Sequence, residues 1–458
     1  MRKQLFESVI ATSLISLSIL PLTASRTWGT DTSSKQQRKS VIVATTNQSS
    51  IARLIENLEQ KYIDVDSSSA RNASKELVSI GKPAVPQLIE GFKRNRSLLT
   101  FEIVETLSQI AQKDASVAQI LIDNLGNNNS QIRSGAIFAL SDSPSKFKTQ
   151  LKKAARDRNP RVRSGAMLAL SNNKVSKFAL PIFRAALNDS NSTVRNIAEA
   201  FLASHDKNPA RITPALKNGL KSNDSLIRVI YAQMLANNDS QVVYATPVLM
   251  EELTNKDAII RSLAIQPLLE ISKTNPQVLP VIIKAINDND SGVQMMAIAE
   301  MHNFRNQSKA IVPALIRATN NRNEIVRASA ILELKKLGSQ ARAATPQLIT
   351  MLRNKRESDG IRINAAAALE KIDSLALIPV LVNSLSERRF GVLSFNLLTN
   401  VASQIDKDKN SYSRTELARA IFGFETALKI IENSEDNFSQ DRIKSLQKSV
   451  AVLKSSRR

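Results

Sequence analysis

The chain has 458 residues, 63 Lys and Arg against 41 Asp and Glu, and a formal net charge of +22. Hydrophobic residues make up 42% and aromatic residues only 4%, so a folded core must be built from Ala, Leu, Ile and Val. The absence of cysteine excludes disulfides, thiolate nucleophiles and zinc–thiolate sites. Two histidines, His205 and His302, leave little material for a histidine metal site or a catalytic triad. Composition therefore disfavours most hydrolase and metalloenzyme chemistry.

The N-terminus has the three parts of a secretory signal peptide. Arg2 and Lys3 precede an apolar run over residues 9–22, and small residues follow at 23–25. A helix over that run spans about 21 Å, which is short for a bilayer core of roughly 30 Å. We therefore predict a signal peptide at 1–25, a flexible leader at 26–50, and export to the periplasm, a lumen or the cell exterior. An uncleaved N-terminal anchor is the alternative.

A repeat of 33 residues organises the chain. Seven prolines follow one another at this spacing without exception: Pro181, Pro214, Pro247, Pro280, Pro313, Pro346 and Pro379. In a second ladder an apolar residue precedes an arginine, and the ladder lapses once, at Gln294; its members are Arg133, Arg163, Arg195, Arg228, Arg261, Arg327 and Arg362. Alanine stands three residues after each ladder position except Arg228, where Tyr231 takes its place, and leucine or methionine stands seven after it. These spacings place the residues on one face of a helix.

Each unit is predicted to be a pair of helices, which we name helix A and helix B. Helix A carries the ladder and follows a polar turn such as 188–190, whose side chains can cap the first helical N–H groups. Helix B is expected to begin at the proline, whose missing N–H has no intrahelical partner in a first turn. The positions two and six residues after the proline are almost always apolar. We expect both positions to pack inward.

This pattern resembles the HEAT-like repeat family, in particular the short variety found in phycobilisome-lyase-type proteins. The resemblance covers residues 68–390, about ten units, and it is close in the first unit, where RNASKELVSIGKPAVP runs from Arg71 to Pro86. It implies an all-α fold, a right-handed α-solenoid of about ten HEAT-like helical-hairpin repeats with helical caps at its ends. Such solenoids serve as scaffolds, transport receptors and lyases, so the resemblance speaks for architecture more than for chemistry.

The segments outside the repeats are predicted to close the solenoid. We expect an N-terminal capping helix over 51–67, the solenoid over 68–402, a polar linker over 403–413 and a C-terminal helical hairpin over 414–458. Ser413 and Glu416 have the spacing of a capping box at the start of that hairpin. Caps of this kind cover the apolar face that a terminal repeat would otherwise expose.

The ladder arginines admit two interpretations. A regular array of guanidinium groups would bind an anion, or each arginine would hold one unit to another. The resemblance favours the structural role, because in HEAT-like repeats this arginine pairs with an aspartate of the preceding turn. Asp224, four residues before Arg228, and Asp257, four residues before Arg261, suit such a pair. Gln294 then marks a locally weaker joint or a kink.

A partner-binding surface is expected on helix B and in the basic stretches. The resemblance implies that helix B lines the concave surface, and its outward positions vary from unit to unit, as on a binding surface or on a merely solvated one. Residues 151–200 carry a net charge of +7 and residues 301–350 one of +6, whereas residues 251–300 carry −3. These charges favour an acidic protein partner, with a polyanion or peripheral contact with an anionic membrane surface as alternatives. The candidate binding residues are Lys152, Lys153, Arg156, Arg158, Lys217, Lys221, Lys284, Arg317 and Arg353.

The sequence contains no phosphate-binding loop, no Gly-rich dinucleotide turn and no nucleophile elbow. We therefore predict a non-catalytic, exported scaffold that binds a protein partner along its concave surface, without a cofactor or a metal. An accessory or lyase-like factor in phycobiliprotein or other tetrapyrrole maturation is the alternative that the resemblance implies, and the signal peptide argues against it. Nucleic acid is disfavoured as a partner, because aromatic residues do not alternate with the basic ones.

Overall fold

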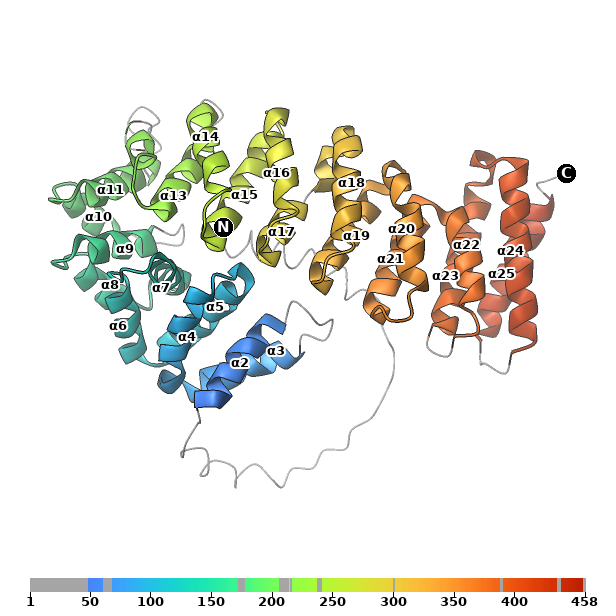
Figure 1. The fold of residues 1–458 in the computed structure, drawn as a ribbon, viewed down its shortest axis with the longest axis horizontal. Coiled ribbons are helices and arrows are strands. Elements are labelled where there is room, and N and C mark those ends of the chain that lie inside the picture. Colours follow the sequence, from blue (N-terminus) through green and yellow to red (C-terminus); the bar gives the residue numbers. More distant parts are fainter. Residues whose placement is uncertain are drawn as a thin grey trace, which may run out of the picture. The chain divides into compact units, whose positions relative to one another are not determined.

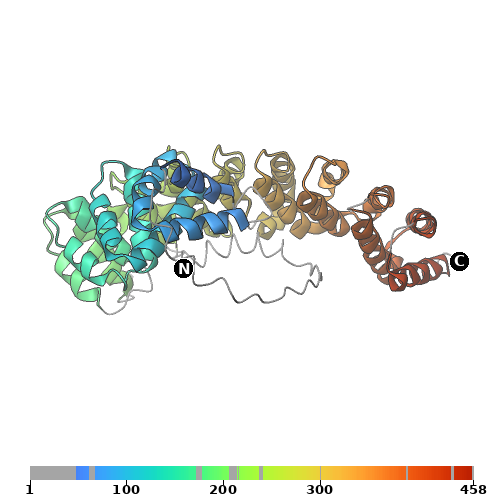
Figure 2. The ribbon, with the colours of Figure 1, turned by 90° about the horizontal axis from the view of Figure 1, so that it is seen from below.

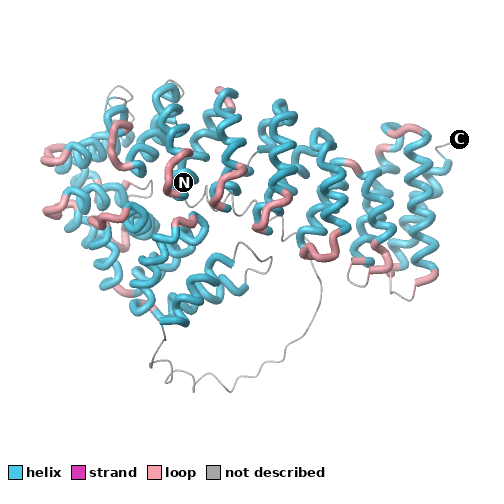
Figure 3. Tube along the Cα trace, viewed as in Figure 1, coloured by secondary structure: helices cyan, strands magenta, loops and turns pink. Residues whose placement is uncertain are grey.

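The computed structural model describes residues 48–60, 68–171, 178–205, 214, 216–236, 241–299, 301–387, 390–434 and 438–455. Within these ranges every regular element is a helix and none is a strand, so the fold is the all-α solenoid that the repeat predicts (Figure 1, Figure 3). The predicted signal peptide and residues 26–47 of the predicted leader lie outside the described residues. None of the helices described is long and apolar enough to span a bilayer.

The chain divides into two compact units, residues 1–297 (unit 1) and residues 298–458 (unit 2). The repeat register predicts a single solenoid, so this division departs from the sequence-based expectation. The boundary falls inside helix α17 (Ser291–Ile298), three residues after Gln294. Because glutamine carries no charge, this repeat cannot form the arginine ion pair that joins its neighbours.

Unit 1 begins with a capping helix and continues as helical hairpins. The cap, α2 (Gln48–Gln60), starts three residues before the predicted position and packs on α3 and α5. Helix A of successive hairpins is α3 (Ser68–Ile80), α5 (Ser97–Lys113), α7 (Ser130–Asp142), α9 (Pro160–Leu170), α11 (Ser192–His205), α13 (Ser225–Ala236), α15 (Ala258–Ser272) and α17. Helix B is α4 (Val85–Gly91), α6 (Ala115–Asn124), α8 (Lys148–Ala154), α10 (Leu180–Ala186), α14 (Val242–Glu252) and α16 (Leu279–Ala285), with short 3-10 turns η1 (Lys82–Ala84), η2 (Phe92–Arg94) and η4 (Pro276–Val278).

Unit 2 continues the same alternation, and Figure 2 shows its successive helix pairs from gold to red. Its helices are α18 (Ser308–Ala318), α19 (Glu324–Leu337), α20 (Thr345–Arg353), α21 (Asp359–Ile372), α22 (Ser374–Asn383), α23 (Gly391–Lys407), α24 (Arg414–Glu432) and α25 (Gln440–Ser455). The 3-10 segments are η5 (Met301–Gln307), η6 (Gly338–Ala344) and η7 (Lys409–Ser411).

The apolar stripe of helix A forms the core. The residue before each ladder position is buried throughout, from Ile132 to Ile361. The position two residues after the proline is also buried in every repeat that carries the proline: Phe183, Leu216, Leu249, Ile282, Leu315, Leu348 and Leu381. The position six residues after the proline was expected to pack inward, and this is wrong at Leu187, which is 40% exposed. Helix α10 ends at Ala186, so Leu187 lies in the turn beyond the helix.

The prolines lie at the start of helix B in only some repeats. Pro86, Pro181, Pro280 and Pro346 occupy one of the first two positions of α4, α10, α16 and α20. Helix B begins five residues earlier in three other repeats, so the predicted start is wrong there, and Pro247, Pro313 and Pro379 lie inside α14, α18 and α22. A proline at the sixth helical position removes one hydrogen bond, to the second residue, close to an end where helices fray.

The C-terminal hairpin is present, and its linker is shorter than predicted. Helix α23 runs to Lys407, so the first five residues of the predicted linker are helical. The capping box is confirmed: the N–H of Glu416 donates to the Ser413 hydroxyl at 3.2 Å, and the Glu416 carboxylate accepts from the N–H of Ser413 at 2.8 Å. Helices α24 and α25 pack on each other and on α22 and α23.

Candidate functional site

The turn from helix B to helix A, which we name the B-to-A turn, has a recurring local design that is clear after α8. Asp157 accepts a hydrogen bond from the N–H of Asn159 at 2.8 Å. The side chain of Asn159 accepts one from the N–H of Arg161 at 3.0 Å and so caps α9. Arg163 then donates to the carbonyl of Asp157 at 2.8 Å. Short polar side chains at alternate positions thus shape the turn, and the ladder arginine closes it.

The other ladder arginines repeat this contact with a carbonyl six residues earlier. The guanidinium-to-carbonyl distances run from 2.5 to 2.9 Å for Arg133, Arg163, Arg195, Arg228, Arg261 and Arg327. Arg362 instead donates to the carbonyl of Leu352 at 2.9 Å. Each ladder arginine therefore ties helix A to the segment that precedes it.

Most ladder arginines also bridge to the following repeat. Arg163 pairs with Asp189 through two hydrogen bonds of 2.7 Å, and Arg261 pairs with Asp288 through bonds of 2.8 and 2.7 Å. Bidentate pairs of this kind fix geometry as well as charge. The same relationship joins Arg228 to Glu252, Arg327 to Glu357 and Arg362 to Glu387.

The predicted partner of the ladder is therefore wrong. Asp224 and Asp257 were expected to pair with the arginines four residues after them, Arg228 and Arg261. Asp257 instead caps the first turn of α15, and Asp224 caps α13 and pairs with Arg133 at 3.1 Å. A capping carboxylate is turned toward the first N–H groups of its own helix, whereas the guanidinium extends outward to the next repeat.

Pairing changes the acid–base properties of the ladder. The hydrogen bond with Asp189 raises the pKa of Arg163, although partial burial opposes this. Burial alone would raise the pKa of Asp189, but hydrogen bonds from Arg163 and the N–H of Asn191 together hold that pKa below its usual value. The side chains of the paired ladder arginines are only 5–21% exposed. Their guanidinium groups are therefore paired with carboxylates of the same chain and are not available to a ligand.

Two contacts in unit 1 join turns that are distant in sequence. The side chain of Asn95 donates to the carbonyl of Lys256 at 2.8 Å and accepts from the N–H of Ala258 at 2.9 Å. The N–H of Ser97 donates to the carboxylate of Asp290 at 3.0 Å. Helix α5 therefore lies beside α15 and the start of α17 (Figure 1).

These contacts define the inward edge of unit 1. The B-to-A turns meet one another across the winding, as they do again where Arg133 reaches Asp224. That helix B lines the concave side stays a prediction. The outward positions of helix B are exposed, as expected, for example at Lys221 and Lys284.

One segment of unit 1 carries free positive charge, and we refer to residues 146–161 as the cationic ridge. It contains seven cations and one acid, Asp157, and it runs through α8 and the following B-to-A turn into α9. All seven cations are exposed, and none forms an ion pair with any residue that the structure describes: Lys146, Lys148, Lys152, Lys153, Arg156, Arg158 and Arg161. Four of them are residues predicted for partner binding.

Two members of the cationic ridge have other side-chain contacts. Arg161 donates to the side chain of Asn128 at 2.9 Å. The ammonium of Lys148 lies 5.2 Å from the centre of the Phe178 ring, a cation–π distance. The remaining five keep their charged groups in solvent, so the ridge has more unpaired charge than the ladder beside it.

The other predicted binding residues do not join the ridge. The ammonium of Lys217 lies 3.4 Å from the centre of the Tyr244 ring, so this lysine is engaged within the chain. The remaining four are exposed and come from four different repeats: Lys221, Lys284, Arg317 and Arg353. Their exposure fits the prediction that they are available to a partner.

A buried carboxylate that sequence analysis missed lies in unit 2. Glu333 is 3% exposed and accepts from the N–H of His302 at 3.0 Å, while its side chain lies 2.8 Å from both the His302 ring and the Lys336 ammonium. Burial opposes the charged form, but these partners hold the pKa of Glu333 below its usual value. The only sequence signal is the Glu–Lys spacing of three. No group of three potential metal ligands occurs in the described part of the chain.

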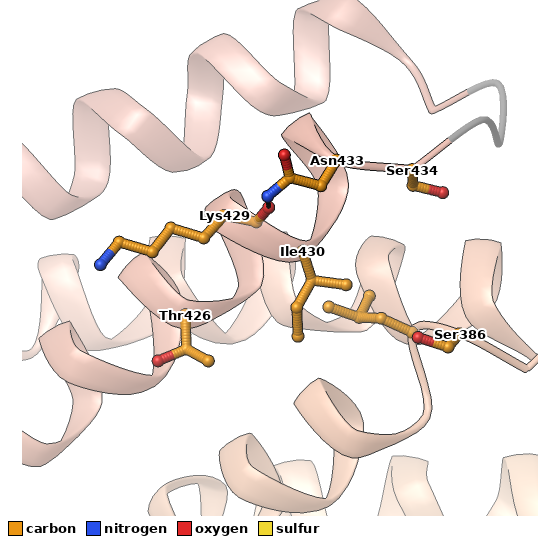
Figure 4. A pocket seen from close by; sticks show the side chains of 7 residues that line it. Ser386, Thr426, Lys429, Ile430, Asn433 and Ser434 are labelled. Carbon is orange, nitrogen blue, oxygen red and sulfur yellow. Dashed lines mark hydrogen bonds between the residues drawn. The ribbon is translucent and has the colours of Figure 1, made fainter.

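A shallow cleft of about 540 Å³ opens beside α24 in unit 2 (Figure 4). Thr426, Lys429, Ile430 and Asn433 line one side, and the turn after α22 lines the other. Asn433 donates to the carbonyl of Lys429 at 2.9 Å, which turns its side chain back on its own helix. The lining side chains include no carboxylate and no histidine, so the cleft contains no pair suited to acid–base catalysis.

Comparison with solved structures finds Kap121p and a Kap95p complex among the matches. Kap121p is 13% identical, with a TM-score of 0.38 over 89% of this chain and 55% of that one. The karyopherin Kap121p bound to the extreme C-terminus of the protein phosphatase Cdc14p is 13% identical. Its TM-score is 0.40, over 88% of this chain and 55% of that one. A structure of Kap95p with RanGDP is 12% identical, with a TM-score of 0.39 over 99% of this chain and 69% of that one. The chain thus spans about half the length of Kap121p.

Sequence comparison identifies the repeat itself. No curated protein matches the chain. The family model for HEAT repeats matches residues 246–335, 279–369 and 311–393, three overlapping stretches that follow the 33-residue register. These stretches contain the helix pairs from α14 to α22 and the ladder arginines Arg261, Arg327 and Arg362. Residues 246–393 therefore consist of HEAT repeats.

Proposed function

We propose that the protein is a non-catalytic, exported scaffold that binds an acidic segment of a partner protein at the cationic ridge. The observation that carries this proposal is the contrast between the two sets of cations. Ladder arginines such as Arg163 are paired within the chain, whereas the five ridge cations without a side-chain contact keep their charge in solvent. Unpaired like charges repel one another, so a surface of this kind is relieved by an anionic ligand.

The ridge presents its cations along one continuous stretch of chain. Helix α8 and the first turn of α9 present cations on both sides of a tight turn, so successive carboxylates of an extended acidic segment would meet successive cations. Exposed ion pairs contribute roughly 0.2–1 kcal/mol each, so several are needed for useful affinity. Such a surface mainly raises the rate of association with an acidic partner and discriminates against partners of the wrong charge. It contributes less to the affinity itself.

A protein segment fits the ridge better than single-stranded nucleic acid does. Single-strand binding depends on aromatic side chains on which bases stack. Between residues 146 and 161 the only aromatic residue is Phe147, which is 2% exposed and belongs to the core. The segment 146–161 itself therefore offers charge without an exposed aromatic side chain.

Charge reversal tests the site. The variant Lys152→Glu, Lys153→Glu, Arg156→Glu and Arg158→Glu should bind a fluorescent poly-glutamate peptide at least about tenfold more weakly than the native chain at 0.15 M salt. The matched control reverses four exposed lysines of unit 2, Lys371, Lys429, Lys444 and Lys448, and changes the net charge equally. Equal loss in both variants would show a general charge effect and contradict a site at the ridge.

Competition separates the kinds of anion. Heparin, duplex DNA and vesicles containing anionic lipid are titrated against the bound poly-glutamate peptide at matched salt. The proposal requires the peptide to be retained best; preferential binding of heparin, DNA or vesicles would assign the ridge to a polyanion or a membrane surface. Export is tested separately by fractionation, where a full-length chain in the cytoplasm would contradict it.

A further inference from the structure

The turn between η2 and α5 ends η2 with a left-handed residue, Asn95, and the same residue makes a distant contact. Asn95 is the one non-glycine residue with a positive φ, 53°, among the residues described. Asparagine tolerates this left-handed conformation better than most residues. The conformation directs its side-chain amide at α15, where it bonds to the residues on either side of Asp257. One side chain thus satisfies a carbonyl and an N–H that lie 161 and 163 residues away.

Ser97 makes the second half of this contact. Its N–H donates to one oxygen of the Asp290 carboxylate at 3.0 Å, and its hydroxyl donates to the other oxygen. Asp290 also accepts from the N–H groups of Gly292 and Val293, so it caps α17 at the same time. Ser97 is fully buried, whereas Asp290 is half-buried, so the contact is partly shielded from water.

The irregularities of the repeat coincide with this contact. Gly292 stands where the neighbouring repeats have Ile259 and Ile325. A Cβ atom at Gly292 would collide with the hydroxyl of Ser97. Gln294, the single lapse in the ladder, lies in the same helix and is 8% exposed. The helix that receives the turn thus differs from its neighbours in the places where they would block it.

We propose that the turn Asn95–Ser97 is a conformational latch, which holds the first hairpins of unit 1 against the starts of α15 and α17 and whose release opens the winding. The latch consists of a few hydrogen bonds, each of modest net strength, so it opens more easily than the repeats unfold. Opening would expose Asp257, which is 5% exposed in the closed form, together with the inward edge of B-to-A turns.

Two substitutions open the latch in different ways. Asn95→Gly keeps a residue that favours positive φ and removes the amide that reaches Lys256 and Ala258. Gly292→Ala removes no hydrogen-bonding group and raises helix propensity, but it inserts a methyl group against Ser97. The control, Asn128→Gly, removes an amide from another B-to-A turn, where it contacts only the adjacent repeat through Arg161.

The chain has no cysteine, so two introduced cysteines can be spin-labelled without background. Labels at Arg94 and Asn289, both exposed, lie on opposite sides of the latch. We expect a narrow, short distance distribution in the otherwise native chain and in Asn128→Gly, and longer, broader distributions in Asn95→Gly and Gly292→Ala. Circular dichroism verifies that every variant keeps its helices.

Amide exchange provides an independent measurement. The N–H groups of Ser97 and Ala258 donate across the latch, and in Asn95→Gly they should exchange at least about tenfold faster than in the native chain. The N–H of Ile132, bonded within its own turn, should be unchanged. Native distances and native exchange in both opening variants would overturn the proposal, as would a native chain whose distance distribution is already long and broad.

Discussion

Ser97 and Asp290 are 193 residues apart in the chain, yet the N–H of Ser97 donates to the Asp290 carboxylate at 3.0 Å. In a linear repeat protein each repeat contacts only its neighbours, and stability is a sum of nearest-neighbour terms. Unit 1 departs from this rule because its winding returns α5 to α15. The early hairpins are therefore held by helices whose sequence lies more than a hundred residues later.

The ladder ion pairs should dominate the coupling between adjacent repeats. Arg261→Ala removes two bonds to Asp288 and one to the carbonyl of Asn255, and it leaves a carboxylate that is only 13% exposed without its partner. We expect a loss of about 2–4 kcal/mol in the free energy of unfolding.

Urea denaturation measures this loss, with Arg195→Ala as the comparison. Arg195 donates to the carbonyls of Asp189 and Ser190, while the Asp189 carboxylate is already paired with Arg163. Its removal should therefore cost about 1–2 kcal/mol. If the two variants are equally destabilised, the carboxylate pair adds nothing beyond the bonds to the turn.

Asp257 should destabilise unit 1 when it is ionised. Burial raises its pKa, despite the hydrogen bonds from the N–H groups of Ile259 and Ile260 and the nearby charge of Arg261. A raised pKa means that the folded state binds the proton more tightly than the unfolded state, so this contribution to stability is present at low pH and is lost as the pH rises through the folded pKa.

Asp257→Asn removes the charge and keeps a good capping side chain, the residue used at the same turn position by Asn129 and Asn323. We expect a higher urea midpoint at pH 7, within the roughly 0.5–2 kcal/mol that single stabilising substitutions yield. The gain should shrink as the pH is lowered. A gain that is constant between pH 3 and 7 would show that charge is not its cause.

Ionisation of Glu333 has the opposite effect from that of Asp257, because it stabilises the folded state. Burial opposes its ionised form, but His302 and Lys336 outweigh that penalty and lower its pKa. Its contribution to stability is therefore present above the unfolded pKa and is lost as the pH falls through the folded pKa. Glu333→Gln should lower the stability of unit 2 at pH 7 by about 1–3 kcal/mol and flatten its dependence on pH in the acidic range. Thermal denaturation across that range tests both effects.

Gly219 and Tyr231 are in contact, and the small glycine makes room for the large tyrosine. Tyr231 stands where most repeats have alanine, and a Cβ at Gly219 would collide with its ring. Gly219→Ala should destabilise by about 1–3 kcal/mol through overpacking, although alanine favours a helix.

The second substitution Tyr231→Ala should recover much of that loss, because it restores the alanine pair of repeats such as that containing Ala186 and Ala198. A double-mutant cycle measured by urea denaturation tests the coupling. Tyr231→Phe serves as a control: the hydroxyl is buried and has no hydrogen-bond partner among the described residues, so its removal should be neutral or stabilising.

The helices and the candidate surface differ in how far the sequence predicts them. The ladder, the buried stripe and the Ser413–Glu416 cap follow from spacing, because caps and helix faces depend on residues within one or two turns. The starts of α14, α18 and α22 were missed, because a proline permits a helix end without requiring one. The exposure of Lys152 and Arg156 was predicted, but their lack of ion pairs depends on which acids the neighbouring repeats bring near.

The sequence by itself determined a repeated pair of helices, their core faces and a strongly basic stretch over residues 151–200, since each is encoded within about 33 residues. Only the tertiary structure decided that Arg261 pairs with Asp288 rather than Asp257, that Asn95 reaches the start of α15, and that B-to-A turns distant in sequence meet in unit 1. The reason is geometric: a small rotation between adjacent repeats is invisible in any one of them, and its accumulation over several repeats decides which distant residues meet.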